Sequence, residues 1–133
     1  MLGTAIADVE GARVATAQRA AAEWGVTVLL KGAYTVVASP EGDVRIIPFA
    51  NPGLATAGTG DVLAGVIASL IAQGVPPYDA ASLGAYLHAA AGEMVTNDIG
   101  NTGLVATDLL PMLPRAIKSV REGTFTGGIQ EIS

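Results

Sequence analysis

The sequence predicts an α/β fold in which one helix precedes an antiparallel meander of three strands and three helices follow. Three observations predict it. Apolar residues recur at helical spacing near the N-terminus, three short strand-like runs follow with brief turn-forming links, and the rest is dense in alanine and leucine. The chain has 133 residues, half of them apolar, which is enough for one domain with a buried core.

The first half of the chain is predicted to form a helix over residues 8–24 and then the meander. The apolar stripe of the helix consists of Val14, Ala17, Ala21 and Trp24. Strands are predicted over residues 26–30, 34–39 and 44–49. The first run is almost continuously apolar, as expected for a strand covered on both faces. Because the links between the runs are short, neighbouring strands are expected to be antiparallel.

The second half is predicted to form three helices. Residues 62–73 are apolar on nearly every side, which indicates deep burial, and Asp79 is a plausible cap for a helix over 80–97 whose many small residues permit close packing. A last helix begins at Thr107 or Asp108, and Pro114 should kink or split it. Its predicted inward residues are Leu110, Leu113, Ile117 and Val120. We expect one domain over residues 1–121 and a flexible tail over 122–133.

Charge and composition narrow the classes of partner. Seven basic and twelve acidic residues give a net charge of −5, which disfavours nucleic acids and anionic membranes as main partners. The chain has no cysteine, so it has no disulfide, thiolate nucleophile or zinc–thiolate site. No secretory signal and no membrane-length apolar run is visible, so a cytoplasmic location is expected.

The candidate chemistry lies in the segment Gly58-Thr59-Gly60-Asp61, just before an apolar helix. Glycines there let a ligand approach the backbone, and the free N–H groups of a helix N-terminus favour an anion such as phosphate. Asp61 could then accept a proton from an attacking hydroxyl group. Alternatively, Asp61 caps the helix and the glycines form a tight connection. The motif alone does not decide between these interpretations, and it is neither a P-loop nor a dinucleotide fingerprint.

Other polar residues admit simpler interpretations. Lys31 could reach a nucleotide phosphate, although a solvated lysine in a hairpin turn is the simpler reading. His88 is interpreted as a structural histidine because no second histidine stands at ligand spacing. Asn51 could orient a phosphate or start the turn at Pro52-Gly53, and the turn is favoured. The remaining carboxylates do not form the convergent set that a metal site needs.

Four stretches together resemble the ribokinase-like superfamily, and within it the C-terminal portion of the ADP/ATP-dependent NAD(P)H-hydrate dehydratases. The stretches are Val28-Leu-Leu-Lys-Gly-Ala33, the glycine-rich block Asn51–Gly65, Tyr86-Leu-His-Ala-Ala-Ala-Gly92 and Gly103-Leu-Val-Ala-Thr-Asp-Leu109. The block Asn51–Gly65 is the specific part. The resemblance implies part of a three-layer α/β/α fold, without the N-terminal half that relatives possess.

The resemblance also implies an activity, the nucleotide-dependent repair of hydrated NADH or NADPH. A nucleotide-binding role is implied for Lys31, Gly32, Ala33, Tyr34, Thr35, Gly58, Thr59 and Gly60. Asp61 would face the hydrated nicotinamide as catalytic base. ADP or ATP would donate the phosphoryl group, with Mg²⁺ carried largely by phosphates and water, and no protein metal ligands are expected.

Two other functions stay open. One is a kinase of the same superfamily that acts on a sugar or vitamin alcohol, and the other is a non-catalytic nucleotide-binding or assembly module. Without the N-terminal half, the strand over 26–30 and the helix after Asp61 would expose apolar surface. We therefore expect a homo-oligomer or completion by another polypeptide.

Overall fold

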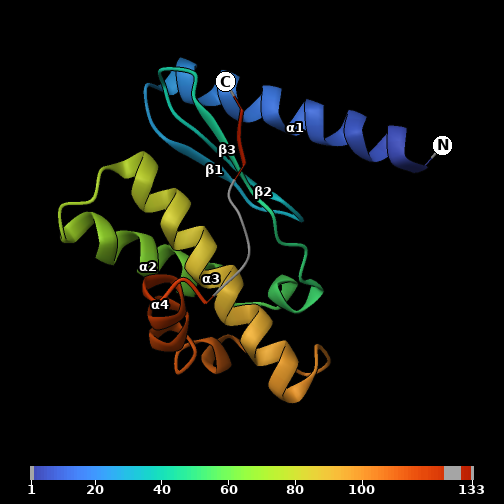
Figure 1. Ribbon diagram of the computed structural model, residues 1–133. Helices are drawn as coiled ribbons and strands as arrows, with labels where there is room; N and C mark the ends of the chain where they lie inside the picture. Colours follow the sequence, from blue (N-terminus) through green and yellow to red (C-terminus); the bar gives the residue numbers. More distant parts are fainter. Residues whose placement is uncertain (1, 125–129, 133) are drawn as a thin grey trace.

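The computed structural model describes residues 2–124 and 130–132, with side chains for residues 11–124. Helix α1 (Leu2–Trp24) lies along one side of a four-stranded sheet, and three further helices lie on the opposite side (Figure 1). These are α2 (Thr59–Ala72), α3 (Pro77–Ile99) and α4 (Leu113–Arg121). Two 3-10 helices lie in the connections: η1 (Pro52–Ala55) between the sheet and α2, and η2 (Ala106–Leu109) between α3 and α4. The predicted order of elements is confirmed.

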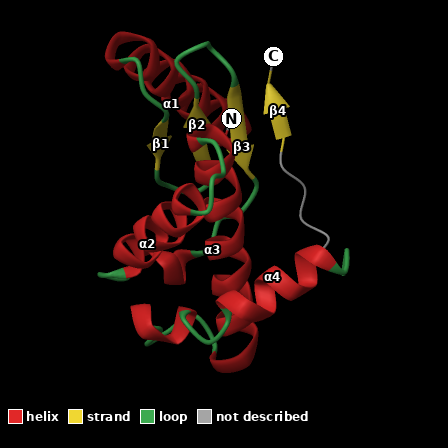
Figure 2. Cartoon of the chain, turned by 90° about the vertical axis from the view of Figure 1, so that its left-hand side faces the viewer, coloured by secondary structure: helices red, strands yellow, loops and turns green. Residues whose placement is uncertain are grey.

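The sheet is an antiparallel meander, as predicted, with one strand more than the sequence indicates. Its order is β1 (Val28–Leu30), β2 (Thr35–Ala38), β3 (Val44–Ile47) and β4 (Gln130–Ile132), and Figure 2 shows the strands side by side. β4 pairs with β3 and belongs to the tail that was expected to be flexible. Residues 125–129 and 133 lie outside the described residues, so the flexibility of the tail stays a prediction.

The two faces of the sheet carry different residues because side chains alternate along a strand. One face packs against α1 through Ala17 and Ala21, which are almost fully buried against Val36, Ala38 and Val44. The opposite face contacts α2 and α3, where Ile47 clusters with Leu63, Ala85 and Tyr86. The chain therefore has the helix–sheet–helix layering that the resemblance implies, and the predicted α/β class is confirmed.

Helix α1 ends at Trp24, as predicted, but its start and the burial of Trp24 differ from the prediction. It begins at Leu2, six residues before the predicted start, and Trp24 at its C-terminal end is 66% exposed. The helical spacing of Trp24 places it on the apolar stripe, but the described residues leave its side chain largely exposed. The prediction that Trp24 faces the core is wrong.

Helix α2 contradicts the prediction of deep burial, because only Thr59 and Leu63 are buried and Ile71 is 45% exposed. One side of α2 packs closely on α3, where a side chain at Gly84 would lie 2.6 Å from Ile67 Cγ1. α2 also contacts β3 through Leu63 and Ile47 and packs against η2, but several of its apolar side chains, including Ile71, are not covered by the described residues. The expectation that this helix exposes apolar surface is therefore confirmed. None of the helices described is long and apolar enough to cross a bilayer.

The predicted start of the following helix, over residues 80–97, also changes. α3 begins at Pro77, so Asp79 lies in its first turn and is not the N-cap. Instead, Asp79 accepts a 2.7 Å hydrogen bond from Arg45 Nη1, which joins α3 to β3.

The last predicted helix is split, as Pro114 indicated. η2 ends at Leu109 and α4 begins at Leu113, with Pro114 in its first turn, where proline is tolerated. The predicted inward stripe is largely exposed, including Leu110, Ile117 and Val120, whereas Leu109 and Ala116 are fully buried. Leu113, Ile117 and Val120 have helical spacing within α4, but the face of α4 that is buried is the one that carries Ala116.

Candidate nucleotide site

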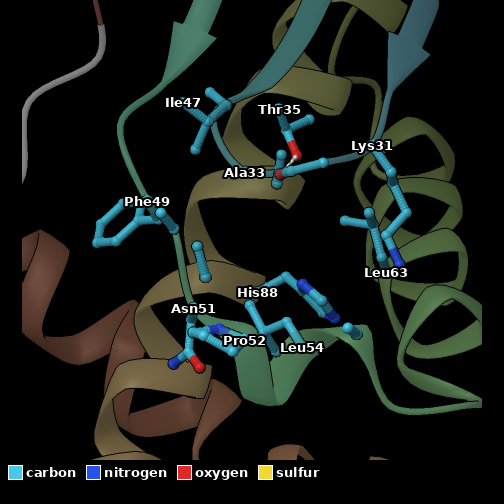
Figure 3. A pocket seen from close by; sticks show the side chains of 15 residues that line it. Lys31, Ala33, Thr35, Ile47, Phe49, Asn51, Pro52, Leu54, Leu63 and His88 are labelled. Atoms are coloured by element: carbon cyan, nitrogen blue, oxygen red, sulfur yellow. Dashed lines mark hydrogen bonds between the residues drawn. The ribbon is translucent and has the colours of Figure 1, made fainter. Parts of the chain in front are cut away.

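A pocket of about 360 Å³ opens between the end of β1, η1 and α3, a size that suits a small organic ligand. Figure 3 shows Lys31, Ala33 and Thr35 on one wall and Asn51, Leu54 and His88 on the opposite one. Among the predicted nucleotide-binding residues, those that line it are Lys31, Gly32, Ala33 and Thr35. The structure thus brings most of the first predicted segment to one cavity.

Tyr34 lies outside this lining and has an unusual backbone. Its φ is 55°, in the left-handed region that bulky residues rarely adopt, and its side chain is partly exposed. Its N–H group donates a 3.0 Å hydrogen bond to the carbonyl of Phe49, which lines the same pocket. Tyr34 therefore shapes the segment through its backbone, while the residues on either side of it face the pocket.

The turn Gly58-Thr59-Gly60 forms the start of α2, with Gly58 as N-cap at a φ of 87°. The single proton of the Thr59 hydroxyl is shared between the carbonyls of Leu54 (2.7 Å) and Thr56 (2.9 Å). The N–H group of Thr59 also bonds to Thr56, whereas those of Gly58 and Gly60 have no acceptor within the described residues. Thr59 holds the turn, and the two glycine amides remain free for a ligand.

The two predicted segments meet at Gly60. A side chain built at this position would lie 3.3 Å from Lys31 Nζ, so the ammonium group lies directly beside the backbone of the turn. A helix N-terminus and a lysine cation both favour a negatively charged group. Their approach over 29 residues of sequence creates an anion-binding arrangement that neither segment has alone.

Asp61 occupies the first turn of α2 and is exposed. Its side chain makes no capping hydrogen bond, and the N-cap is Gly58, so the capping interpretation is wrong. Asp61 does not line the pocket that contains Lys31 but a second hollow of about 590 Å³ between α2 and α4. That hollow is mainly apolar, and its walls include Val66, Leu70 and Leu113. Asp61 therefore lies next in sequence to the free Gly60 amide while facing a separate cavity.

His88 is the main feature of the site that sequence reasoning left in a structural role. It is 3% exposed, lines the pocket, and bonds through Nε2 to the Thr59 carbonyl at 2.8 Å. Burial lowers the pKa of His88, and the positive charge of Lys31 acts in the same direction, while the bond to Thr59 opposes them. Because a carbonyl only accepts, Nε2 carries the proton of the neutral ring and Nδ1 is left as an acceptor.

Asn51 forms the turn, as the favoured interpretation held. Its side-chain oxygen accepts from Gly53 N–H, and its amide donates to Glu93 and Thr96 at 3.0 Å each. Asp108 likewise accepts from Val105 N–H in η2. These side chains hold the connections around the pocket. Within the part of the chain that the structure describes, no three His, Cys, Asp or Glu residues cluster as metal ligands.

Comparison with known proteins agrees with this arrangement. Residues 1–115 match the family model of the NAD(P)H-hydrate dehydratases. The chain belongs to this family. It is 48% identical over 126 residues to a bifunctional NAD(P)H-hydrate repair enzyme of Moorella thermoacetica, covering 95% of this chain and 24% of the relative. It is also 46% identical over 112 residues to an ADP-dependent (S)-NAD(P)H-hydrate dehydratase of Neisseria meningitidis, covering 84% of this chain and 38% of the relative.

The fold has a counterpart among solved structures. The ADP/ATP-dependent NAD(P)H-hydrate dehydratase of Bacillus subtilis, co-crystallised with ATP and Mg²⁺, superposes with a TM-score of 0.77 at 35% identity. The match covers 83% of this chain and 40% of that protein. The chain thus spans between a quarter and two fifths of the length of these relatives. The family inferred from the sequence is confirmed.

Proposed function

We propose that this chain supplies the nucleotide site and the catalytic base for the nucleotide-dependent dehydration of hydrated NADH or NADPH. The observation that carries the proposal is that Lys31 lies beside the turn whose Gly58 and Gly60 amides are free. Asp61, which does not cap the helix, follows directly in the sequence. The relative from Neisseria meningitidis is named as an ADP-dependent enzyme of this reaction, and the Bacillus subtilis structure was obtained with ATP and Mg²⁺.

In this proposal the nucleotide lies in the pocket beside residues 31–35 with its phosphates directed toward the Gly58–Gly60 turn. Phosphoryl transfer depends on positioning and charge stabilisation more than on covalent chemistry by the protein. Lys31 and the two free amides offer positive charge and donors of fixed direction to the phosphoryl oxygens. The glycine at position 60 leaves room for Lys31 to approach.

Asp61 would accept the proton of the ring hydroxyl while the hydroxyl oxygen attacks the terminal phosphorus atom of the nucleotide. The bond between that phosphorus and the leaving nucleotide breaks as the new one forms. Phosphate then leaves the ring carbon, a proton is lost from the neighbouring carbon, and the double bond of the nicotinamide returns. The hollow lined by Asp61 and apolar residues of α2 and α4 is the proposed place for the ring.

The residues present fit a nucleotide better than they fit a metal ion held by protein alone. The cradle of amides and lysine suits phosphate, whereas the described residues offer no cluster of three metal-ligating side chains. Mg²⁺ usually keeps several waters and binds through one or two carboxylates and substrate phosphates. It would neutralise phosphate charge here, and the assigned roles of Lys31 and Asp61 do not depend on it.

An activity assay with an Asp61 variant tests the proposal. The chain is incubated with NADH hydrate and Mg²⁺, and recovery of NADH absorbance is measured with and without ADP or ATP. We expect recovery only with nucleotide, and a 10²- to 10⁴-fold loss of turnover in Asp61→Asn with unchanged ADP affinity. Asp98→Asn, an exposed carboxylate at the far end of α3, is the control and should keep full activity.

The other outcomes of this assay separate the alternatives. Binding of ADP without recovery of NADH would favour a non-catalytic nucleotide-binding module. Nucleotide turnover with a sugar or vitamin alcohol, and none with the hydrate, would favour a kinase. Asp61→Asn with full activity would contradict the role of Asp61 as base.

We also propose that a polypeptide outside these residues completes the fold. β1 is an edge strand in the described sheet, and its residues are only half-buried. Apolar side chains are also exposed, including Val26 just before β1 and Ile71 of α2. Exposed strand edges and apolar patches are the usual places where another chain packs. Size-exclusion chromatography with light scattering should show a homo-oligomer or a complex; a monomer with a cooperative thermal transition would contradict this.

A further inference from the structure

Arg13 of α1 contacts the segment 31–35 in a way that the proposed function does not use. Its Nη1 donates to the carbonyls of Ala33 (2.7 Å) and Tyr34 (3.3 Å), and its Nη2 donates to the carbonyl of Leu30 (3.1 Å). One half-buried guanidinium group therefore binds three backbone carbonyls across a five-residue segment. A planar fork of donors is suited to such a task, and a lysine cannot reproduce it.

The position of Gly32 depends on the same contact. A side chain built at Gly32 would lie 2.5 Å from Arg13 Nη2 and 2.9 Å from Cζ. The φ of Gly32 is not in the left-handed region, so conformational freedom does not require glycine there. Glycine is required there because the guanidinium group of Arg13 passes so close to the backbone.

The contact also accounts for the conformation of Tyr34. A φ of 55° costs a bulky residue about 1–2 kcal/mol and persists only where the surroundings hold it. Arg13 binds the carbonyls on both sides of the Tyr34 Cα, and Phe49 O accepts from the Tyr34 N–H group. The strained residue is thus held from both sides.

Fixing these carbonyls determines what faces the pocket. A peptide unit is planar and trans, so a carbonyl held toward Arg13 sends the next N–H group the opposite way. This applies to the N–H groups of Lys31, Tyr34 and Thr35, and that of Tyr34 is directed to the Phe49 carbonyl. Leu30 is the last residue of β1, so the same bond sets where the Lys31 side chain begins its path to Gly60.

We propose that Arg13 is a positioning residue of the nucleotide site, which fixes the backbone of residues 31–35 through three carbonyls and thereby directs Lys31. The proposal rests on the proposed function only for the identity of the ligand. Arg13 lies 18 residues before Lys31 on the opposite side of the sheet from α3, and it does not line the pocket. Its effect on a ligand is therefore indirect.

Amide hydrogen exchange of the full chain without nucleotide tests the positioning directly. In Arg13→Ala, exchange of the Tyr34 amide should accelerate about tenfold or more, because its bond to Phe49 O loses the support of the fixed loop. Buried amides of α3 should not change. Arg19→Ala is the matched control, since Arg19 lies on the same helix, is exposed and has no hydrogen bond within the described residues. Unchanged Tyr34 exchange in Arg13→Ala would overturn the proposal.

Gly32→Ala gives an independent check through a double-mutant cycle. In the parent chain the new methyl group collides with Arg13 and should also accelerate exchange at Tyr34. In the Arg13→Ala background the collision is absent, so Gly32→Ala should add little. Additive effects of the two substitutions would contradict a shared mechanism.

Calorimetric titration with ADP measures the functional consequence. Arg13→Ala should raise the Kd for ADP about tenfold, Arg13→Lys should recover less than half of that loss in free energy, and Arg19→Ala should match the parent. In turnover, the loss should appear in KM for nucleotide and not in kcat. Failure of the parent chain to bind ADP would contradict the proposed function, whereas altered Tyr34 exchange would still support Arg13 as the positioning residue.

Discussion

The two segments that meet at the candidate site are held by different means. Residues 31–35 are fixed by Arg13, a half-exposed cation that reaches across from α1. The turn Gly58–Gly60 is fixed by Thr59 and His88, which are both buried. In each case a side chain occupies backbone carbonyl oxygens. In the turn, the N–H groups of Gly58 and Gly60 have no acceptor among the described residues, which is the arrangement that an anionic ligand needs.

The difference teaches where each segment is vulnerable. A buried polar group left without its partner costs the full desolvation of that group, whereas an exposed one regains water. The Gly58–Gly60 turn should therefore be coupled to the stability of the whole chain. The segment 31–35 should be coupled mainly to ligand binding.

The largest expected effect comes from removing a threonine hydroxyl from each of the two segments in turn. Thr59→Val removes the hydroxyl donor that two carbonyls share, from a side chain that is 1% exposed, so the free energy of unfolding should fall by about 1–3 kcal/mol. Thr35→Val deletes one 3.3 Å bond to Gly32 O at a half-buried position and should cost about 0.5 kcal/mol or less. Denaturant unfolding measures both, and equal losses would break the comparison.

A second pair of variants sharpens the description of the turn itself. Gly58→Ala forces an L residue to a φ of 87° and brings its methyl group 3.1 Å from Ala106 Cβ, so it should destabilise by about 1–2 kcal/mol. Gly60→Ala meets only the flexible end of Lys31 and should leave the melting temperature nearly unchanged while weakening ADP binding. A larger stability loss for Gly60→Ala than for Gly58→Ala would show that the turn is held differently.

The smallest expected effect is a pH dependence of the free energy of unfolding that arises from His88. The pKa of His88 is lowered from 6.5 in the folded chain, mainly by burial. Below pH 6.5 the unfolded chain therefore takes up a proton that the folded chain excludes, and the free energy of unfolding falls as pH drops toward the lowered pKa.

The comparison with His88→Gln isolates this contribution. Glutamine can still donate to Thr59 O but does not titrate, so its stability should decline less between pH 6.5 and more acidic values than that of the parent. Thermal melting over this pH range measures the difference. Parallel curves for the two proteins would contradict a buried, neutral His88.

Several parts of the site could be predicted from the sequence because they depend on local chemistry. The glycines at 58 and 60 indicate a tight approach to a helix start, and Asn51 before Pro52-Gly53 indicates a turn. The roles of His88 and Arg13 could not be predicted from the sequence. His88 bonds to a carbonyl 29 residues away, and Arg13 bonds to one 20 residues away. A neighbouring polar acceptor leaves no trace in the spacing of either helix. Trp24 and Leu110 fail for a related reason, because helical spacing says which face is apolar and not whether anything covers it.

By itself the sequence determined the order of helix, meander and helices, the antiparallel pairing, and the backbone freedom at Gly58 and Gly60. These follow from side-chain period, link length and local sterics, which act over a few residues. Only the tertiary structure decided that Lys31 lies against Gly60 and that Arg13 binds the backbone of the segment 31–35. It also decided that α2 stays largely exposed. Those are contacts between distant parts of the chain, and their geometry exists only once the layers have packed.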